Sequence, residues 1–298
     1  MRERIRKGFL ISLCGLILLT GCSKAGGKSP SEISVSSGDG TENGAFPAVV
    51  CGVKLEKAPE RVVSLSPATT EIICELGFGE KLVGISDYCD YPEGLSAERV
   101  GSTENPDIDA ILESMPDAVF TLSALSERET YALNQANIAV LTAKPPENTE
   151  GYSALYSDIS AAFYGTELAD GDMRRSEQIG KAALSSLENA AKGVRLGSFV
   201  YVTGKLTAAG AGTFEGAVLG LSGENVCKIG GYVPLDMIEI APDYIIADSS
   251  LTESELTADS VLNGYINGGA KIRFVDAALF ERPSARTAEV FKQITDNI

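Results

Sequence analysis

The sequence has no histidine and no tryptophan in its 298 residues. Histidine is the usual general base at neutral pH and the commonest protein ligand of zinc, copper and haem iron. Serine and cysteine nucleophiles are present, but no histidine can activate them. The composition therefore argues against an enzyme, and we expect no resident cofactor or metal.

Basic residues are also scarce, since 25 Lys and Arg stand against 41 Asp and Glu and give a net charge of −16. Nucleic acids and anionic bilayer surfaces are bound by basic patches. We therefore expect no nucleic-acid partner. A small ligand is not excluded, because its pocket is set by local residues.

No apolar run is long enough to cross a bilayer comfortably, which takes about 20 residues. The longest run, at 8–19, follows a basic start and ends at Leu19-Thr20-Gly21-Cys22. This pattern indicates an export signal. The four residues resemble the bacterial lipobox, whose cysteine receives a diacylglyceryl group before cleavage. We expect removal of 1–21 and lipidation of Cys22; a simple secretory site with an incidental cysteine is the alternative.

The stretch at 22–45 is rich in Ser, Gly and Lys and has the composition of a flexible tether. Two acyl chains anchor a protein stably where one does not. The expected location is therefore extracytoplasmic, with a lipid anchor in the cell membrane.

Four further cysteines, Cys51, Cys74, Cys89 and Cys227, allow three complete disulfide pairings. Their spacings are not those of a metal knuckle. Outside the cytoplasm disulfides can form, but buried free thiols are an equal alternative.

Strand and helix patterns alternate twice along the rest of the chain. The first series predicts strands at 48–53, 61–65, 81–86, 118–122 and 138–141, and helices at 66–76 and 105–115. Ser66-Pro67 and Asn105-Pro106 mark the two helix starts, each as an N-cap residue before proline. Such alternation predicts a parallel sheet covered on both faces.

A helical stretch separates the two series. It comprises helices at 150–163 and about 166–192, and the second could reach roughly 40 Å, enough to join two lobes. The second series predicts a strand at 198–203, a helix at 214–221, a further element at 235–241 and a strand at 244–247.

The expected fold is α/β, with two Rossmann-like lobes whose parallel sheets are joined by one long helix. The predicted parts are an N-terminal lobe at 46–145, a helical segment at 146–192 and a C-terminal lobe at 193–298. Pro116-Asp117 and Pro242-Asp243 each precede a strand, which suggests a duplicated architecture.

Two segments at predicted strand ends suit a ligand site. At 66–70 a helix N-terminus follows a strand, where α/β sheets bind ligands; an ordinary capped helix is the alternative. At 87–92 the loop Asp-Tyr-Cys-Asp-Tyr-Pro presents two tyrosines, whose flat faces suit a large planar ligand. The glycines at 210–216 have the spacing GxGxxxG, which we interpret as a close turn entering a helix and not as a dinucleotide site.

These segments carry a family likeness. The sequences RVVSLSPATTE at 61–71 and LVGISDYCDYP at 82–92, with Val100-Gly101 and Pro116-Asp117, resemble the helical-backbone substrate-binding proteins of ABC importers. Members of that family carry cobalamin, ferric siderophores or haem. The likeness extends from Val49 to the C-terminus and includes ERPSAR at 281–286.

The resemblance implies two lobes that hold the ligand between them and close modestly on it, and it is nearest to the cobalamin branch. The residues it implies as ligand contacts are Pro67, Ala68, Tyr88 and Tyr91 on the first lobe and Phe280 and Arg282 on the second. Cobalamin binders commonly set tryptophan at two further positions, which fall here near Thr103 or Glu104 and at Leu122. Thr103 and Leu122 complete the predicted contacts.

The resemblance also implies a partner, the importer permease, whose arginines meet an acidic residue on the crown of each lobe. Asp109, seven residues before Pro116, and Asp236, six before Pro242, are the matching residues. The alternative is a carboxylate favoured by the dipole in the first turn of a helix.

The sequence thus predicts a monomeric, lipid-anchored solute-binding protein that captures a corrinoid-like metal chelate and delivers it to an ABC importer. A ferric-siderophore or haem binder of the same fold is one alternative. An extracytoplasmic enzyme or sensor built on these lobes is another.

Overall fold

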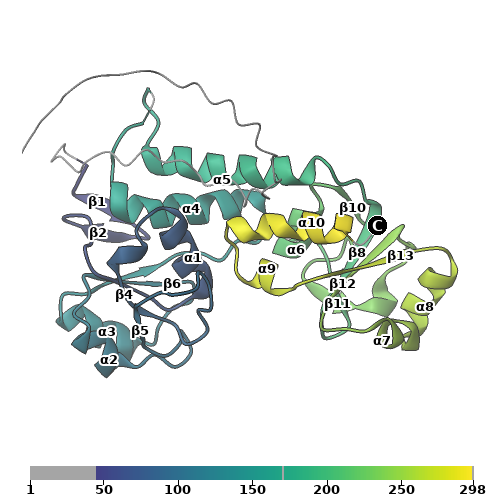
Figure 1. Ribbon diagram of the computed structural model, residues 1–298, viewed down its shortest axis with the longest axis horizontal. Helices are drawn as coiled ribbons and strands as arrows, with labels where there is room; N and C mark the ends of the chain where they lie inside the picture. The colour runs from purple at the N-terminus through teal and green to yellow at the C-terminus, as the bar shows by residue number, and fades with distance from the viewer. Residues whose placement is uncertain (1–44, 170, 297–298) are drawn as a thin grey trace, which may run out of the picture. The chain divides into compact units, whose positions relative to one another are not determined.

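The computed structural model describes residues 45–169 and 171–296 (Figure 1). The predicted signal segment, the lipidation site at Cys22 and the tether up to residue 44 lie outside the described residues. Within the described ranges, no helix combines the length and the apolar character needed to cross a membrane.

A β-hairpin opens the described chain, where the sequence predicted one strand at 48–53. Strands β1 (Ala48–Val50) and β2 (Val53–Leu55) pair antiparallel. Cys51 and Gly52 reverse the chain between them, with φ of 49° and 78°.

The N-terminal lobe, called the N-lobe below, contains the predicted parallel sheet, in the order β5-β4-β3-β6-β7. Its strands are β3 (Val62–Ser64), β4 (Leu82–Ile85), β5 (Glu98–Arg99), β6 (Ala118–Thr121) and β7 (Ala139–Thr142). The connections contain α1 (Pro67–Glu75), the short η1 (Gly79–Lys81), α2 (Ile108–Glu113) and α3 (Glu127–Gln135). The predicted alternation of strand and helix is confirmed.

Two helices of this lobe differ from the prediction. The helix expected from Asn105 begins at Ile108, because the Asp107 side chain is its N-cap and accepts a hydrogen bond from the Ala110 N–H at 3.0 Å. Helix α3 was not predicted, since its sequence is almost entirely polar and only Leu133 is buried. Its start is fixed by a capping box between Ser126 and Glu129.

The helical segment consists of α4 (Thr149–Tyr164) and α5 (Arg175–Ala191), which lie side by side (Figure 1). Gly180 lets them approach closely, because a Cβ atom there would lie 2.4 Å from the Ser153 carbonyl oxygen. Helix α5 has 17 residues and spans about 26 Å. The prediction of one helix over 166–192 is therefore too long, since Leu168 and Arg174 form a β-bridge before α5 begins.

Helix α5 leads into the C-terminal lobe, called the C-lobe below. Its sheet has the order β11-β9-β8-β12-β13, with β10 also paired to β8. The strands are β8 (Gly197–Val202), β9 (Thr207–Ala209), β10 (Gly223–Asn225), β11 (Tyr232–Pro234), β12 (Tyr244–Asp248) and β13 (Lys271–Val275). Strands β8 and β12 match the two predicted strands and pair in parallel, as expected for this lobe. Strands β10 and β13 extend this parallel group, whereas β9 and β11 extend the sheet antiparallel, and none of these four strands was predicted.

The remaining elements of the C-lobe are short. They are α6 (Phe214–Leu219), η2 (Leu235–Met237), α7 (Glu253–Ala258), α8 (Ser260–Asn267), α9 (Ala278–Glu281), η3 (Ala285–Ala288) and α10 (Glu289–Asp296). The element predicted at 235–241 is thus only one 3₁₀ turn. The glycine-rich stretch at 210–216 is a close turn, as interpreted: a Cβ atom on Gly210 would lie 1.9 Å from the Ile229 carbonyl oxygen, and Thr213 caps α6.

The aspartates of the two Pro-Asp pairs make equivalent hydrogen bonds in the two lobes. Asp117 accepts hydrogen bonds from the Glu60 and Arg61 N–H groups, at 2.7 and 3.0 Å, just before β3. Asp243 accepts from the Ser198 N–H at 2.8 Å and from its hydroxyl at 2.7 Å, at the start of β8. Each aspartate therefore fastens the first strand of its lobe's parallel sheet, which fits the predicted duplication.

Candidate ligand-binding site

The predicted N-lobe contacts lie at one edge of the sheet. Pro67 and Ala68 follow β3, the loop at 87–92 follows β4, Thr103 follows β5 and Leu122 follows β6. Because the four strands are parallel, these positions gather at their carboxyl ends, where α/β sheets bind ligands. We call this set the N-lobe rim.

The loop at 87–92 presents its tyrosines and buries its cysteine. Tyr88 is 65% exposed and Tyr91 42%, whereas Cys89 is buried and its Sγ lies 3.1 Å from the Thr70 hydroxyl. The Tyr88 N–H donates to the Ser86 hydroxyl at 3.2 Å. The two tyrosines are thus held outward by a loop that is anchored on its inner side.

The start of α1 differs from its prediction. Ser66 is the N-cap residue, but its side chain makes no capping hydrogen bond. Ala68 is only 1% exposed, so its methyl group is part of the core and only its backbone could meet a ligand. Pro67, in contrast, is partly exposed.

Thr103 and Leu122 are both partly buried. The Thr103 hydroxyl donates to the Leu65 carbonyl oxygen at 2.9 Å, so it ties the segment after β5 to the end of β3. Leu122 packs against the main hydrophobic core. Their ligand contact remains a prediction.

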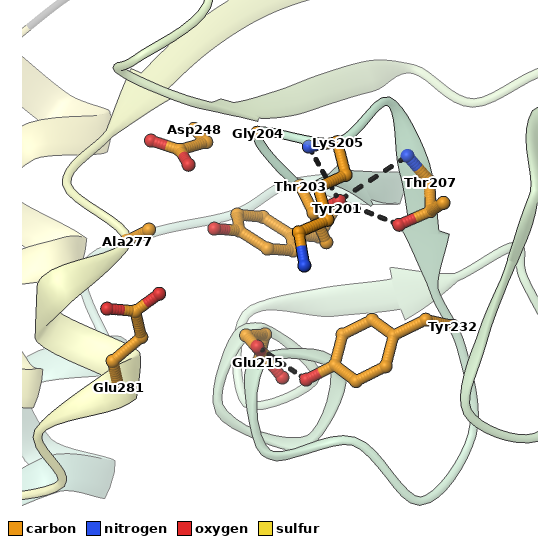
Figure 2. Close-up of a pocket in the computed structure, with 10 residues that line it drawn as sticks. All are labelled: Tyr201, Thr203, Gly204, Lys205, Thr207, Glu215, Tyr232, Asp248, Ala277 and Glu281. Atoms are coloured by element: carbon orange, nitrogen blue, oxygen red, sulfur yellow. Dashed lines mark hydrogen bonds between the residues drawn. The ribbon is translucent and has the colours of Figure 1, made fainter.

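The C-lobe contains a cavity of about 580 Å³ that the sequence did not predict. It lies beside the carboxyl ends of β8 and β12, and we call it the C-lobe pocket. Its lining residues are Tyr201, Thr203, Gly204, Lys205, Thr207, Glu215, Tyr232, Asp248, Ala277 and Glu281 (Figure 2).

Two tyrosines shape the pocket. Tyr232 is 57% exposed and donates its hydroxyl to Glu215 Oε1 at 2.8 Å. Tyr201 is buried and packs edge-on against Phe280, with ring centroids 5.2 Å apart. Figure 2 shows the Tyr201 hydroxyl pointing toward Ala277, between Asp248 and Glu281. Burial, and then the nearby carboxylates, raise the pKa of both tyrosines, so both are neutral phenols at physiological pH.

Three carboxylates and one ammonium group give the pocket an acidic balance. Glu215, Asp248 and Glu281 come from three different elements, and Lys205 lies on the turn between β8 and β9. Gly204 brings that turn close to Asp248, since a Cβ atom there would lie 2.7 Å from Asp248 Oδ2. Among the described residues no cluster of His, Cys, Asp and Glu has the grouping of a metal site.

The two predicted C-lobe contacts lie next to this pocket. Phe280 is only 4% exposed and supports Tyr201 from the core side. Arg282 is partly buried and forms an ion pair with Asp90 of the N-lobe rim loop. Glu281 in the pocket and Arg282 at the rim are neighbours in the chain, so α9 connects the two halves of the candidate site.

The segment that follows Arg282 makes further contacts with the N-lobe. The Ser284 hydroxyl donates to Glu71 Oε2 at 2.6 Å, and Arg286 lies 3.3 Å from Glu71 Oε1. The Arg286 guanidinium also covers the ring of Tyr91, 4.5 Å from its centroid. The Ala285 N–H donates to Glu75 at 3.1 Å.

Burial has the largest effect on the pKa values of Glu71 and Glu75, which lie one turn apart on α1. It raises the pKa of Glu71 despite the Ser284 hydroxyl and the Arg286 guanidinium beside it. It raises the pKa of Glu75 to about 7, although Tyr156 and Ala285 both donate hydrogen bonds to that carboxylate. The contact between the lobes thus contains a group that titrates near neutral pH.

Asp109 and Asp236, the predicted permease contacts, are both exposed. Asp109 lies in the first turn of α2, and Asp236 lies on the single 3₁₀ turn η2. Neither carboxylate forms an ion pair with a described residue. Their docking role remains a prediction.

The four cysteines of the folded part are free thiols in the structure. Burial raises the pKa of Cys51 to about 12 and that of Cys74 to about 11. It also raises the pKa of Cys89. These three thiols are therefore protonated at neutral pH and are not activated nucleophiles.

Two α/β lobes joined through a linking helix, with the candidate site at the carboxyl ends of the strands, form a fold shared with solved periplasmic binding proteins. Residues 62–167 match the family model described as periplasmic binding protein. This match spans β3 to β7 and α1 to α4. The family resemblance is thereby confirmed for this part of the chain.

Two curated relatives are similar to parts of the chain. An uncharacterized ABC transporter substrate-binding lipoprotein of Bacillus subtilis is 28% identical over 138 residues, 46% of this chain and 42% of the relative. A vitamin B12-binding protein of Yersinia pestis is 45% identical over 64 residues, 21% of this chain and 23% of the relative. The chain therefore spans less than half the length of these relatives.

Solved structures confirm the fold over more of the chain. The periplasmic vitamin B12 binding protein BtuF of Vibrio cholerae matches with a TM-score of 0.57 at 20% identity, covering 80% of this chain and 96% of that one. The periplasmic heme-binding protein RhuT of Roseiflexus matches with a TM-score of 0.61 at 19% identity, covering 80% and 97%.

Proposed function

We propose that this protein is an extracytoplasmic solute-binding protein that captures a corrinoid or a related metal chelate and delivers it to an ABC importer. The ligand is held between the N-lobe rim and the C-lobe pocket. The observation that carries the proposal is the position of both sets at the carboxyl ends of their strands, on a fold shared with chelate-binding proteins. The local identity of 45% to a vitamin B12-binding protein supports a corrinoid as the first ligand to test.

The chemistry of the two sets suits a large, flat ligand. Tyr88 offers an exposed aromatic face to a planar macrocycle, and Tyr91 stays 42% exposed although the Arg286 guanidinium covers one face of its ring. The C-lobe pocket has a volume typical of small-molecule sites and would receive groups at the ligand's edge. Arg282 completes the arrangement, because its ion pair with Asp90 connects the pocket to the rim loop.

A haem or ferric-siderophore ligand is the second candidate. The structural similarity to a heme-binding protein supports it, because the same fold accommodates that chelate. An enzyme on these lobes is less favoured, since the relatives named above are binding proteins and the sequence offers no histidine.

Delivery requires a membrane partner. We propose that Cys22 carries the lipid anchor and that Asp109 and Asp236 meet the permease. The exposure of both aspartates and their lack of ion-pair partners among the described residues support this role. Reversing the charge with Asp109→Lys should reduce uptake of the chelate into cells and leave its affinity for the purified protein unchanged.

The test of the proposed ligand is calorimetric titration of the chain expressed from residue 23 with cyanocobalamin, haem and a ferric hydroxamate. One-to-one binding of cyanocobalamin, tighter than that of the other two, is expected. Tighter binding of haem or of the hydroxamate would replace the corrinoid as ligand, and turnover of any of them would contradict a binding role.

A further inference from the structure

We infer that the C-lobe pocket makes the protein select chelates that present hydrogen-bond donors, such as carboxamides or ammonium groups, and reject chelates that present carboxylates. This inference rests on the proposed function, because it assigns the ligand's chemical class at the same site. It follows from the charge of the pocket, the state of its hydrogen bonds and the way its carboxylates are held.

The charge of the pocket is negative overall. Glu215, Asp248 and Glu281 face one cation, Lys205, whose side chain is exposed. None of the three carboxylates forms an ion pair with a described residue. A ligand carboxylate placed in this cavity would lose water and meet like charges, whereas a donor would be attracted.

Hydrogen-bond acceptors outnumber donors in the pocket. Glu215 Oε1 accepts from Tyr232, but its Oε2 is buried and has no hydrogen-bond partner among the described residues. A buried acceptor without a partner is costly, so its lack of a partner shows that the pocket has no spare donor within reach of this oxygen. Asp248 uses one oxygen for the Ser250 N–H at 2.9 Å.

The carboxylates are also held in place. Tyr232 fixes Glu215, the Ser250 N–H fixes Asp248, and the close approach of Gly204 leaves Asp248 little room to turn away. The turn that carries Gly204 is itself closed by a 2.7 Å hydrogen bond between the Thr203 and Thr207 hydroxyls (Figure 2). Acceptors held in position discriminate between donors and anions better than mobile surface carboxylates do.

This distinction separates the candidate ligands. The periphery of a corrinoid such as cobalamin carries carboxamides, which donate hydrogen bonds and bear no charge. Haem carries two propionates, which are anionic at neutral pH. Ferric chelates divide in the same way, since some hydroxamates are neutral or cationic whereas citrate complexes are anionic.

The test compares cyanocobalamin with its monocarboxylate derivatives, in which one peripheral carboxamide is hydrolysed to a carboxylate. At least one derivative should bind the unaltered protein about tenfold or more weaker than cyanocobalamin. The variants Glu281→Gln and Asp248→Asn should each reduce that ratio. Glu239→Gln, a charge change at an exposed residue of the same lobe outside the pocket, should leave it unchanged. Circular dichroism melting of each variant shows whether the fold is kept.

The outcomes are distinguishable from those of the proposed function. If cyanocobalamin binds and every monocarboxylate binds as tightly, the inference is wrong and the proposed function stands. If no corrinoid binds, haem and a cationic ferric hydroxamate repeat the comparison, and a preference for haem overturns the inference. If no chelate binds at all, the proposed function is wrong, and the inference that rests on it is wrong as well.

Discussion

The N-lobe rim and the C-lobe pocket meet a ligand in opposite ways, although the lobes are built alike. The rim presents Tyr88 and Tyr91 outward from a loop, whereas the pocket holds Tyr201 and Tyr232 beside carboxylates. At the other end of each sheet, the same Pro-Asp device fastens the first strand in both lobes. The two lobes therefore share the residues that hold the sheet in place, but they differ in the residues at the candidate ligand site.

The contrast also separates residues that support the site from residues that touch the ligand. Phe280 and Tyr88 were both predicted as ligand contacts, but one is buried and the other exposed. Five substitutions test how the two regions are held and what they contact, in order of expected effect.

Phe280→Ala should lower the free energy of unfolding by about 3–5 kcal/mol, because the ring is buried and packs on Tyr201. Urea denaturation measures this value. A loss below about 1 kcal/mol would show that Phe280 is not a core residue, and would restore it as a direct ligand contact.

Glu75→Gln should flatten the pH dependence of stability. The folded protein keeps a proton on Glu75 up to a pKa of about 7, whereas the unfolded chain releases it near the ordinary value of 4.5. The unfolding free energy therefore falls as pH rises between these values, by at most about 3 kcal/mol, and is level above them.

The measurement is urea unfolding of both proteins at pH 4.5, 6 and 8. Glu71, whose pKa is raised in the same direction, leaves a residual slope of the same sign in the variant. Glu80→Gln, at an exposed position just after α1, is the matched control and should keep the full slope. An unchanged slope in Glu75→Gln would contradict the account of the lobe contact.

Asp117→Ala and Asp243→Ala should each lower stability by less than Phe280→Ala does, since each removes a carboxylate that accepts two hydrogen bonds near the start of its lobe's first parallel strand. Chemical denaturation of the two variants gives the loss of stability for each aspartate and shows whether the two losses are equal. A large loss of stability for one variant and none for the other would show that the two aspartates do not have equivalent roles in the two lobes.

Tyr88→Ala should change stability by no more than about 0.5 kcal/mol, because the side chain is 65% exposed. Its effect should appear in cyanocobalamin affinity, with a loss of about tenfold from the missing aromatic face. Calorimetry of the variant tests this, and unchanged affinity would mean that the tyrosine is an ordinary loop residue.

What the sequence could predict is local. The start of α1 at Pro67, the loop after β4 and the Pro-Asp pairs are short patterns, and the structure has each of them where the sequence placed it. The gathering of the rim residues followed from the rule that parallel strands share their carboxyl edge. Helix α3 escaped prediction because tertiary position and a capping box hold it, with a single buried leucine.

The C-lobe pocket could not be predicted, because its residues come from separate strands, turns and helices. Tyr201 and Glu281 are 80 positions apart and carry no motif. A glycine at position 204 indicates a turn, but its importance for the pocket depends on Asp248, which β12 brings beside it. Likewise, a buried glutamate on α1 has meaning only once the segment at 284–286 packs against it.

The central claim, that one ligand contacts both lobes, is tested most directly by amide hydrogen exchange with and without saturating cyanocobalamin. The account predicts slower exchange in the loop at 87–92 and around Tyr201 and Tyr232 in the same complex. Slower exchange in only one lobe, or in neither, would contradict it.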